Sequence, residues 1–212
     1  NLEDDFNQLA DCDWIIEVIV ERLDLKQQLF ERVETFRKPG TLISSNTSGI
    51  PISQLSEGRS EDFQKHFCGT HFCNPPRYLQ LLEIIPGPKT EQKVIDFFMG
   101  YGESILGKQS VLCKDTPAFI ANRVGVFAIQ ALFHTVEDMG LSVDKVDKLT
   151  GPAMGRPKSA TFRTCDVVGL DTLVHVANGV AINCPNDERS ESFAIPKYVQ
   201  HLVDNNWLGS KS

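Results

Sequence analysis

The stretch Asp13-Trp-Ile-Ile-Glu-Val-Ile-Val20 is an almost continuous apolar run, and the segment after it has a different period. A short run of this kind is typical of a strand that is buried on both faces of a parallel sheet. From Glu21 to Lys38, apolar residues recur at helical spacing until Pro39-Gly40 ends the segment. We therefore expect a strand followed by a helix, which is the repeating unit of an α/β sheet.

The same alternation continues to about residue 115. Further strands are expected at 41–45, 67–72, 81–85 and 110–113, with a short helix at 52–55 and a longer one at 91–106. This order predicts a doubly wound, Rossmann-type α/β sheet. After residue 115 only helices are expected, at 142–149, 165–178 and 196–207 besides one that opens this part. We divide the chain into an α/β domain, 1–115, and an all-α domain, 116–212.

The helix that opens the second domain has a clear start signal. Asp115-Thr-Pro117 offers a polar cap followed by Pro in the first turn, and the pattern then runs to Met139 and Gly140. Its residues are apolar nearly all round. Such a helix is expected to lie buried between other helices or in a subunit interface.

Composition excludes several classes of protein. The 212 residues carry a net charge of −7, which argues against a nucleic-acid partner because such proteins present a basic face. The six cysteines include no Cys-x-x-Cys pair, which argues against a metal site and favours a reducing cytoplasmic location. No stretch approaches the roughly 20 apolar residues that span a bilayer, so no membrane contact is expected. The first residues begin mid-pattern, so we interpret the chain as an excerpt of a longer protein.

Two polar residues stand in apolar runs that the pattern assigns to neighbouring strands. His71 ends the first run and Glu83 lies in the middle of the second. Strands of opposite direction can bring residues about twelve apart face to face, and the carboxylate would then orient the imidazole as a general base. Alternatively, His71 is an ordinary core residue and Glu83 faces solvent. The spacing alone leaves both readings open.

Three further groups of polar residues are weaker candidates. Ser44-Ser-Asn-Thr-Ser48 follows a buried strand, where ligands of open α/β sheets bind, although such residues also make ordinary turns. Glu21 and Lys26 follow the preceding strand and are expected to line the same crevice at the strand ends. Alternatively, Glu21 only compensates the helix dipole and Lys26 only faces solvent. Asn122 needs a hydrogen-bond partner if it is buried, either a substrate carbonyl or a neighbouring loop. The chain has no Gly-x-Gly-x-x-Gly, Gly-x-Ser-x-Gly or zinc-ligand spacing.

Several motifs in the same order resemble the 3-hydroxyacyl-CoA dehydrogenase family. They are Ile16-Glu-Val-Ile-Val-Glu21, Ser45-Asn-Thr-Ser48, Thr70-His-Phe-Cys-Asn-Pro75, Lys114-Asp-Thr-Pro-Ala-Phe-Ile-Ala-Asn-Arg123 and Asp166-Val-Val-Gly-Leu-Asp171. The stretch Gly155-Arg-Pro-Lys-Ser-Ala-Thr-Phe-Arg163 is similar to the long bacterial fatty-acid-oxidation members, which often carry an enoyl-CoA hydratase domain on the same chain.

This resemblance implies an NAD-dependent oxidation of 3-hydroxyacyl-CoA to 3-oxoacyl-CoA in β-oxidation. His71 then matches the catalytic base and Glu83 its partner, so that the pair takes the hydroxyl proton while NAD accepts hydride. Ser48 and Asn122 match polar contacts to the acyl-CoA substrate, and Asn74 matches the residue that holds the His region.

The cofactor contacts are likewise implied by resemblance. Glu21, Lys26 and Lys211 match residues that contact NAD, and Ser48 also matches a position near the nicotinamide. The helical domain is expected to form a homodimer, as in the family.

The chain departs from the family pattern in two ways. Cys73 stands where Phe is more usual, and the glycine-rich βαβ unit that holds the cofactor's pyrophosphate would precede residue 1. We therefore expect the chain as given to bind NAD poorly and to be inactive. The alternatives are a non-catalytic dimerisation or structural module of a multifunctional protein, and a related β-hydroxyacid dehydrogenase acting on free acids.

Overall fold

The computed structural model describes residues 5–210 and divides into two compact units, 1–120 and 121–212. Unit 1 is built around a five-stranded sheet in the order β1-β2-β3-β4-β5. The strands are β1 (Trp14–Glu17), β2 (Leu42–Ser45), β3 (Phe67–Phe72), β4 (Leu81–Pro86) and β5 (Gln109–Leu112). The first three are parallel, β4 runs antiparallel to β3, and β5 is parallel to β4.

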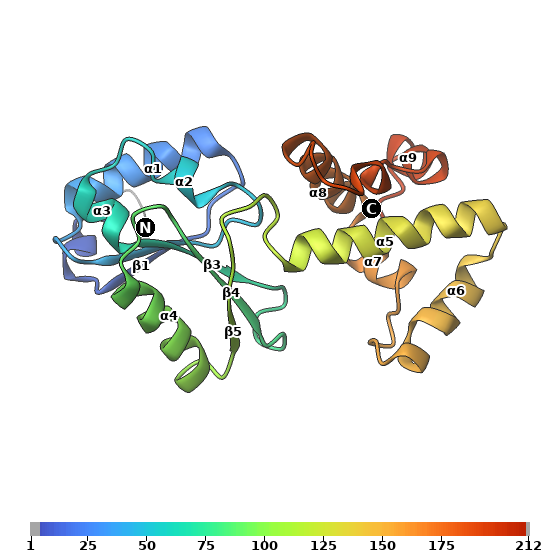
Figure 1. Ribbon diagram of the computed structural model, residues 1–212, viewed down its shortest axis with the longest axis horizontal. Coiled ribbons are helices and arrows are strands. Elements are labelled where there is room, and N and C mark those ends of the chain that lie inside the picture. The colour runs from blue at the N-terminus through green and yellow to red at the C-terminus, as the bar shows by residue number, and fades with distance from the viewer. Residues whose placement is uncertain (1–4, 211–212) are drawn as a thin grey trace. The chain divides into compact units, whose positions relative to one another are not determined.

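Helices cover both faces of this sheet, as the sequence predicts. On one side lie α1 (Leu23–Phe36), α2 (Ile52–Leu55) and α3 (Glu61–His66), and on the other lies α4 (Gln92–Ser104) (Figure 1). A short 3₁₀ helix, η1 (Phe6–Asp11), precedes β1. The strands alternate between two cores because successive side chains point to opposite faces. Phe67 and Ile85 belong to the core with α1–α3, whereas Cys68 and Ile84 pack with the apolar residues of α4.

The first strand differs from the prediction. It ends at Glu17 and is not buried on both faces, because Ile16 and Val18 are 43% and 69% exposed while Glu17 is 3% exposed. Among the described residues β1 is an edge strand of the sheet. The apolar run therefore contains a strand that buries the carboxylate of Glu17, which pairs with the ammonium of Lys26.

Unit 2 is all-helical. It comprises α5 (Ala121–Met139), α6 (Val143–Thr150), η2 (Pro152–Met154), α7 (Phe162–Val168), α8 (Leu170–Asn183), η3 (Ser190–Phe193) and α9 (Lys197–Asp204). The single helix expected at 165–178 is two helices, since Gly169 adopts φ +96° and bends the chain by 95°. No single helix among the described residues has the length and apolar character of a membrane span, although α7 and α8 together pass on those two criteria alone.

The start of α5 also differs from the prediction. Ala118 and Phe119 have positive φ, and the helix begins only at Ala121. The carboxylate of Asp115 caps a different helix, because it accepts the N–H groups of Ile52 and Ser53 at 2.6 and 2.9 Å. Within unit 2, α5 buries one stripe of residues and leaves others exposed, so it is not buried all round.

Candidate active site

The polar residues singled out in unit 1 lie on the side of the sheet where the parallel strands end. Because β1, β2 and β3 are parallel, their carboxyl ends meet at the same edge. Glu21, Ser48 and Cys73 follow those three strands, and Glu83 joins them from the antiparallel β4. Ligands of open α/β sheets bind at this edge.

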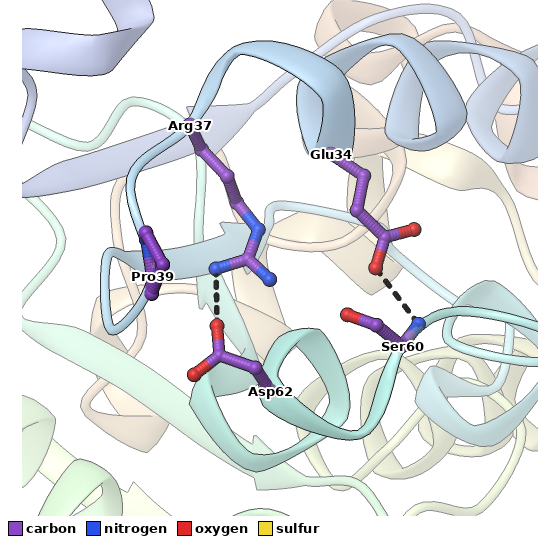
Figure 2. Close-up of a pocket in the computed structure, with 5 residues that line it drawn as sticks. All are labelled: Glu34, Arg37, Pro39, Ser60 and Asp62. Atoms are coloured by element: carbon purple, nitrogen blue, oxygen red, sulfur yellow. Dashed lines mark hydrogen bonds and ion pairs between the residues drawn. The ribbon is translucent and has the colours of Figure 1, made fainter.

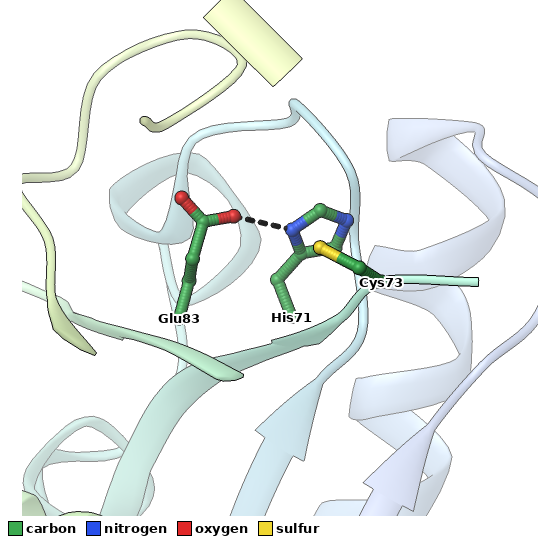
Figure 3. A group of neighbouring side chains, drawn as sticks. All are labelled: His71, Cys73 and Glu83. Atoms are coloured by element: carbon green, nitrogen blue, oxygen red, sulfur yellow. Dashed lines mark hydrogen bonds and ion pairs between the residues drawn. The ribbon is translucent and has the colours of Figure 1, made fainter. Parts of the chain in front are cut away.

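His71 and Glu83 meet across the β3–β4 pair. They are directly opposite in the strand register, and His71 Nδ1 lies 2.6 Å from Glu83 Oε2 (Figure 3). His71 is 4% exposed and Glu83 is fully buried. The structure therefore has the first of the two arrangements that the sequence leaves open. A carboxylate in this position fixes the imidazole orientation and stabilises the imidazolium that forms on proton uptake.

The other carboxylate oxygen of Glu83 is held by two donors that the sequence did not reveal. Glu83 Oε1 accepts the backbone N–H of Ile120 at 2.9 Å and the thiol of Cys113 at 3.6 Å. Burial, together with the charge of Glu83 and this hydrogen bond, raises the pKa of Cys113 to about 12. The thiol therefore remains a neutral donor. The positive-φ turn before Ile120 brings that N–H to the carboxylate, and nothing in residue spacing predicts such a contact.

The imidazole is enclosed by neighbouring chain segments. Its ring lies 5.8 Å from the ring of Phe119, measured between centroids. Asn46 after β2 accepts the backbone N–H of Phe72 at 2.9 Å, so it ties the end of β3 to the β2 loop. Asn74 is exposed and precedes the cis peptide bond to Pro75. Its holding role stays a prediction.

A buried ion pair lies below the loop that carries Ser48. Lys26 Nζ is 2.7 and 2.9 Å from the two carboxylate oxygens of Glu17, and both side chains are 1% exposed. The hydroxyl of Ser45 donates to Glu17 Oε2 at 2.5 Å, and the carbonyl of Ile19 accepts from Lys26 at 3.2 Å. The ammonium is thus committed within the protein. An acidic residue inside an apolar run was the available signal for Glu17, as it was for Glu83.

Glu21 connects this ion pair to the loop after β2. Its Oε2 lies 3.3 Å from Lys26 Nζ, while Oε1 accepts the hydroxyl of Thr47 at 2.6 Å and the backbone N–H of Ser48 at 2.8 Å. Burial alone would raise the pKa of Glu21, but the Thr47 hydrogen bond, the Lys26 charge and the Ser48 N–H together lower it. The structure therefore brings Glu21, Lys26 and half-buried Ser48 together as one network.

The roles of two further predicted site residues stay predictions. Asn122 lies in the first turn of α5 in unit 2 and is half-buried there, so its contact with substrate stays a prediction. Lys211 lies outside the described residues.

A pocket of about 390 Å³ lies elsewhere in unit 1, where α1 ends and α3 begins. Its lining residues pair with one another: Arg37 bonds Asp62 at 2.6 Å, and Glu34 accepts the backbone N–H of Ser60 at 2.7 Å (Figure 2). Because Pro39 in its wall precedes β2, the pocket lies toward the amino end of that strand, away from His71. The paired charges there join two helices, and we assign the pocket no role.

Comparison with known proteins identifies the two parts of the chain. Residues 1–116 match the family described as 3-hydroxyacyl-CoA dehydrogenase, NAD binding domain, and residues 119–212 match 3-hydroxyacyl-CoA dehydrogenase, C-terminal domain. The chain is 52% identical, over its full length, to a probable 3-hydroxyacyl-CoA dehydrogenase of Bacillus subtilis, of which it covers 27%. It is 34% identical to a putative fatty acid oxidation complex trifunctional enzyme of Rickettsia felis, again over its full length and 29% of that protein.

A solved structure has the same fold. The crystal structure of Mycobacterium tuberculosis FadB2 superposes with a TM-score of 0.87 at 28% identity, covering 98% of the chain and 70% of FadB2. The chain thus spans well under a third of the two relatives above and over two thirds of this one.

Proposed function

Because the chain belongs to the 3-hydroxyacyl-CoA dehydrogenase family, we propose that it oxidises a 3-hydroxyacyl-CoA to the 3-oxoacyl-CoA with NAD, as a step of fatty-acid β-oxidation. The observation that carries this proposal is the buried contact between His71 and Glu83 at the carboxyl edge of the sheet. Oxidation of a secondary alcohol requires a base for the hydroxyl proton, and a neutral imidazole oriented by a carboxylate is suited to that step.

His71 takes the central role in this mechanism. Its Nδ1–H donates to Glu83, which leaves Nε2 with the lone pair that accepts the substrate's 3-hydroxyl proton. Glu83 stays ionised and stabilises the imidazolium that results. The Ile120 N–H and the Cys113 thiol occupy the second carboxylate oxygen, so Glu83 cannot rotate away from His71 without losing both. In the reverse direction the imidazolium returns the proton to the carbonyl oxygen.

The residues at the edge fit the nicotinamide part of NAD, which when bound accepts the hydride from C3. A carboxamide and ribose hydroxyls pair with hydrogen-bond donors and acceptors, and Ser48 has a hydroxyl and Glu21 a carboxylate in this part of the structure. Lys26 places no free charge at this edge because Glu17 neutralises it. We propose that Ser48 contacts nicotinamide and substrate, and that Lys26 supports the NAD site through Glu21.

The wider setting is proposed on three further grounds. The Rickettsia relative, named as a trifunctional enzyme of a fatty acid oxidation complex, supports a place in fatty-acid oxidation and further activities on the same chain, one of which we propose is an enoyl-CoA hydratase. Exposed Val124 and Met139 on α5 support a homodimer through the helical unit, with Asn122 on the same helix contacting the acyl-CoA. All six cysteines are free thiols, which supports a reducing cytoplasmic location.

The test is the substrate class of the whole protein that carries this chain. NADH oxidation is measured with acetoacetyl-CoA and, separately, with free acetoacetate at the same concentrations. We expect turnover with the thioester and a rate at least about a hundredfold lower with the free acid. Preference for the free acid would instead identify a β-hydroxyacid dehydrogenase. No turnover by the folded protein with any acyl length would leave a structural or dimerisation module as the function.

A further inference from the structure

The sheet places a third metal-binding side chain beside His71 and Glu83. Cys73 follows β3 two residues after His71, and in extended chain residues two apart point to the same face. Glu83 reaches that face from the opposite strand. The ligand atoms of the three residues all lie within 4.8 Å of one another (Figure 3). This group is the one of its kind found in residues 5–210.

The chemistry of the three donors selects a class of cation. One imidazole nitrogen, one sulfur and one carboxylate oxygen form a mixed set that suits Zn²⁺, whereas Mg²⁺ and Ca²⁺ require oxygen ligands. Bond lengths of about 2.0–2.3 Å around a tetrahedral Zn²⁺ imply ligand separations of about 3.3–3.5 Å. The 2.6 Å contact between His71 and Glu83 must open slightly, and the thiol must close from at most 4.8 Å. Rotation of one short side chain is of the right size for this change.

The surroundings of the cluster allow an ion to enter and to be held. Cys73 is half-buried whereas His71 and Glu83 are buried, so Cys73 is the most solvent-exposed of the three ligands. The Ile120 N–H holds the Glu83 carboxylate from behind, as the outer partners of metal ligands do. Burial and the charge of Glu83 raise the pKa of the Cys73 thiol, whereas the ammonium of Lys108, whose charge opposes a cation, acts to lower it. Carbonyl oxygens of Pro76 and Leu79 already accept from that ammonium.

We propose that His71, Cys73 and Glu83 form an inhibitory site for Zn²⁺, or for a similar thiophilic divalent cation. On binding, the metal replaces the thiol proton of Cys73, which is released to water, and takes the place of the proton on Nδ1 of His71, which moves to Nε2 by exchange with water. The imidazole then has no lone pair for the substrate's proton. The binding follows from the donors alone, while the inhibition rests on the proposed function.

The test uses ZnCl₂ alone with the whole protein, before any cofactor or substrate is added. Zn²⁺ affinity is measured by competition with a chromophoric chelator, and thiol protection by alkylation followed by mass spectrometry. We expect one Zn²⁺ to bind, to protect Cys73 from alkylation, and to bind at least about tenfold more weakly in Cys73→Ala. Cys12→Ala is the matched control, because Cys12 is also a half-buried free thiol. Equal affinity in wild type and Cys73→Ala, or a loss only in Cys12→Ala, overturns the proposal.

Turnover then separates this site from the proposed function. Zn²⁺ should inhibit wild type and the Cys12→Ala variant over the concentration range in which Zn²⁺ binds to them. Cys73→Ala should be inhibited only at Zn²⁺ concentrations at least about tenfold higher. The rate of each protein is compared with the rate of the same protein without zinc. Cys73-dependent binding without any acyl-CoA turnover would refute the dehydrogenase and leave the metal site standing. Acyl-CoA turnover without Cys73-dependent binding would do the reverse.

Discussion

Replacement of Lys26 by Met is expected to destabilise unit 1 severely. The ammonium lies 2.7 Å from Glu17, both side chains are 1% exposed, and Glu21 is the only other carboxylate within 4 Å of it among the described residues. Removing one member of a buried ion pair leaves the other charge uncompensated, which costs about 3–5 kcal/mol. That is a large part of the 5–15 kcal/mol or so that holds a typical domain folded.

The measurement is urea denaturation followed by tryptophan fluorescence. Trp14 lies in β1 of unit 1, whereas Trp207 lies in unit 2, so a Trp207→Phe background isolates the first unit. Lys38→Met is the matched control because Lys38 pairs with Asp13 at a similar 2.9 Å, yet those side chains are 47% and 95% exposed. The control should cost no more than about 1 kcal/mol.

A second substitution tests whether the cost arises from the stranded carboxylate. Adding Glu17→Gln to Lys26→Met removes the uncompensated charge, so the double variant should recover at least about 2 kcal/mol of what Lys26→Met loses. If Lys26→Met costs as little as Lys38→Met, the buried ion pair does not hold this part of the fold and the reasoning is refuted.

Three other stability effects follow from single contacts. Burial raises the pKa of Cys68 from 9.0 to about 12, so the stability that this thiol contributes is complete below pH 9 and is lost as pH rises toward 12. In urea titrations at alkaline pH, wild type should therefore lose about 1.4 kcal/mol of unfolding free energy per pH unit more than Cys68→Ala. Equal slopes for the two proteins would contradict this. Gly69→Ala should cost about 1–3 kcal/mol, because the added Cβ would lie 2.8 Å from the side chain of Ile52. Gly100→Ala in α4 is the control, because its Cβ would meet nothing within 4 Å and the change should be neutral or stabilising. Thermal melts of the two variants test this difference. Asp147→Ala should destabilise unit 2 by about 1–3 kcal/mol, because the Asp147 carboxylate accepts three backbone N–H groups at the start of α7. Asp138→Ala is the control because Asp138 is exposed, and urea denaturation followed by Trp207 fluorescence should separate the two variants.

The sequence was most informative where local pattern and fold agree. The strands that flank the site, 67–72 and 81–85, were predicted within a residue of β3 and β4, because each is a short apolar run bounded by turn residues. Strand pairing then put His71 opposite Glu83, and that follows from antiparallel geometry. The identity of the family followed from several motifs in one order.

Other features depend on partners that are distant in the sequence. Asp115 looked like the cap of the helix that follows it, yet its carboxylate binds N–H groups some sixty residues earlier. A positive-φ turn at Ala118 and Phe119 delays α5 and delivers the Ile120 N–H to Glu83. Capping propensity is local, so it cannot reveal which helix end a carboxylate reaches.

The central claim is that His71 is the general base and Glu83 orients it. The most direct measurement compares wild type, His71→Gln and Glu83→Gln in acetoacetyl-CoA-dependent NADH oxidation by the whole protein, with NADH affinity and thermal melting recorded for each. We predict that His71→Gln lowers kcat by about a hundredfold or more, and that Glu83→Gln lowers it less, with both variants folded and binding NADH. Turnover by folded His71→Gln within a few-fold of wild type would contradict the account.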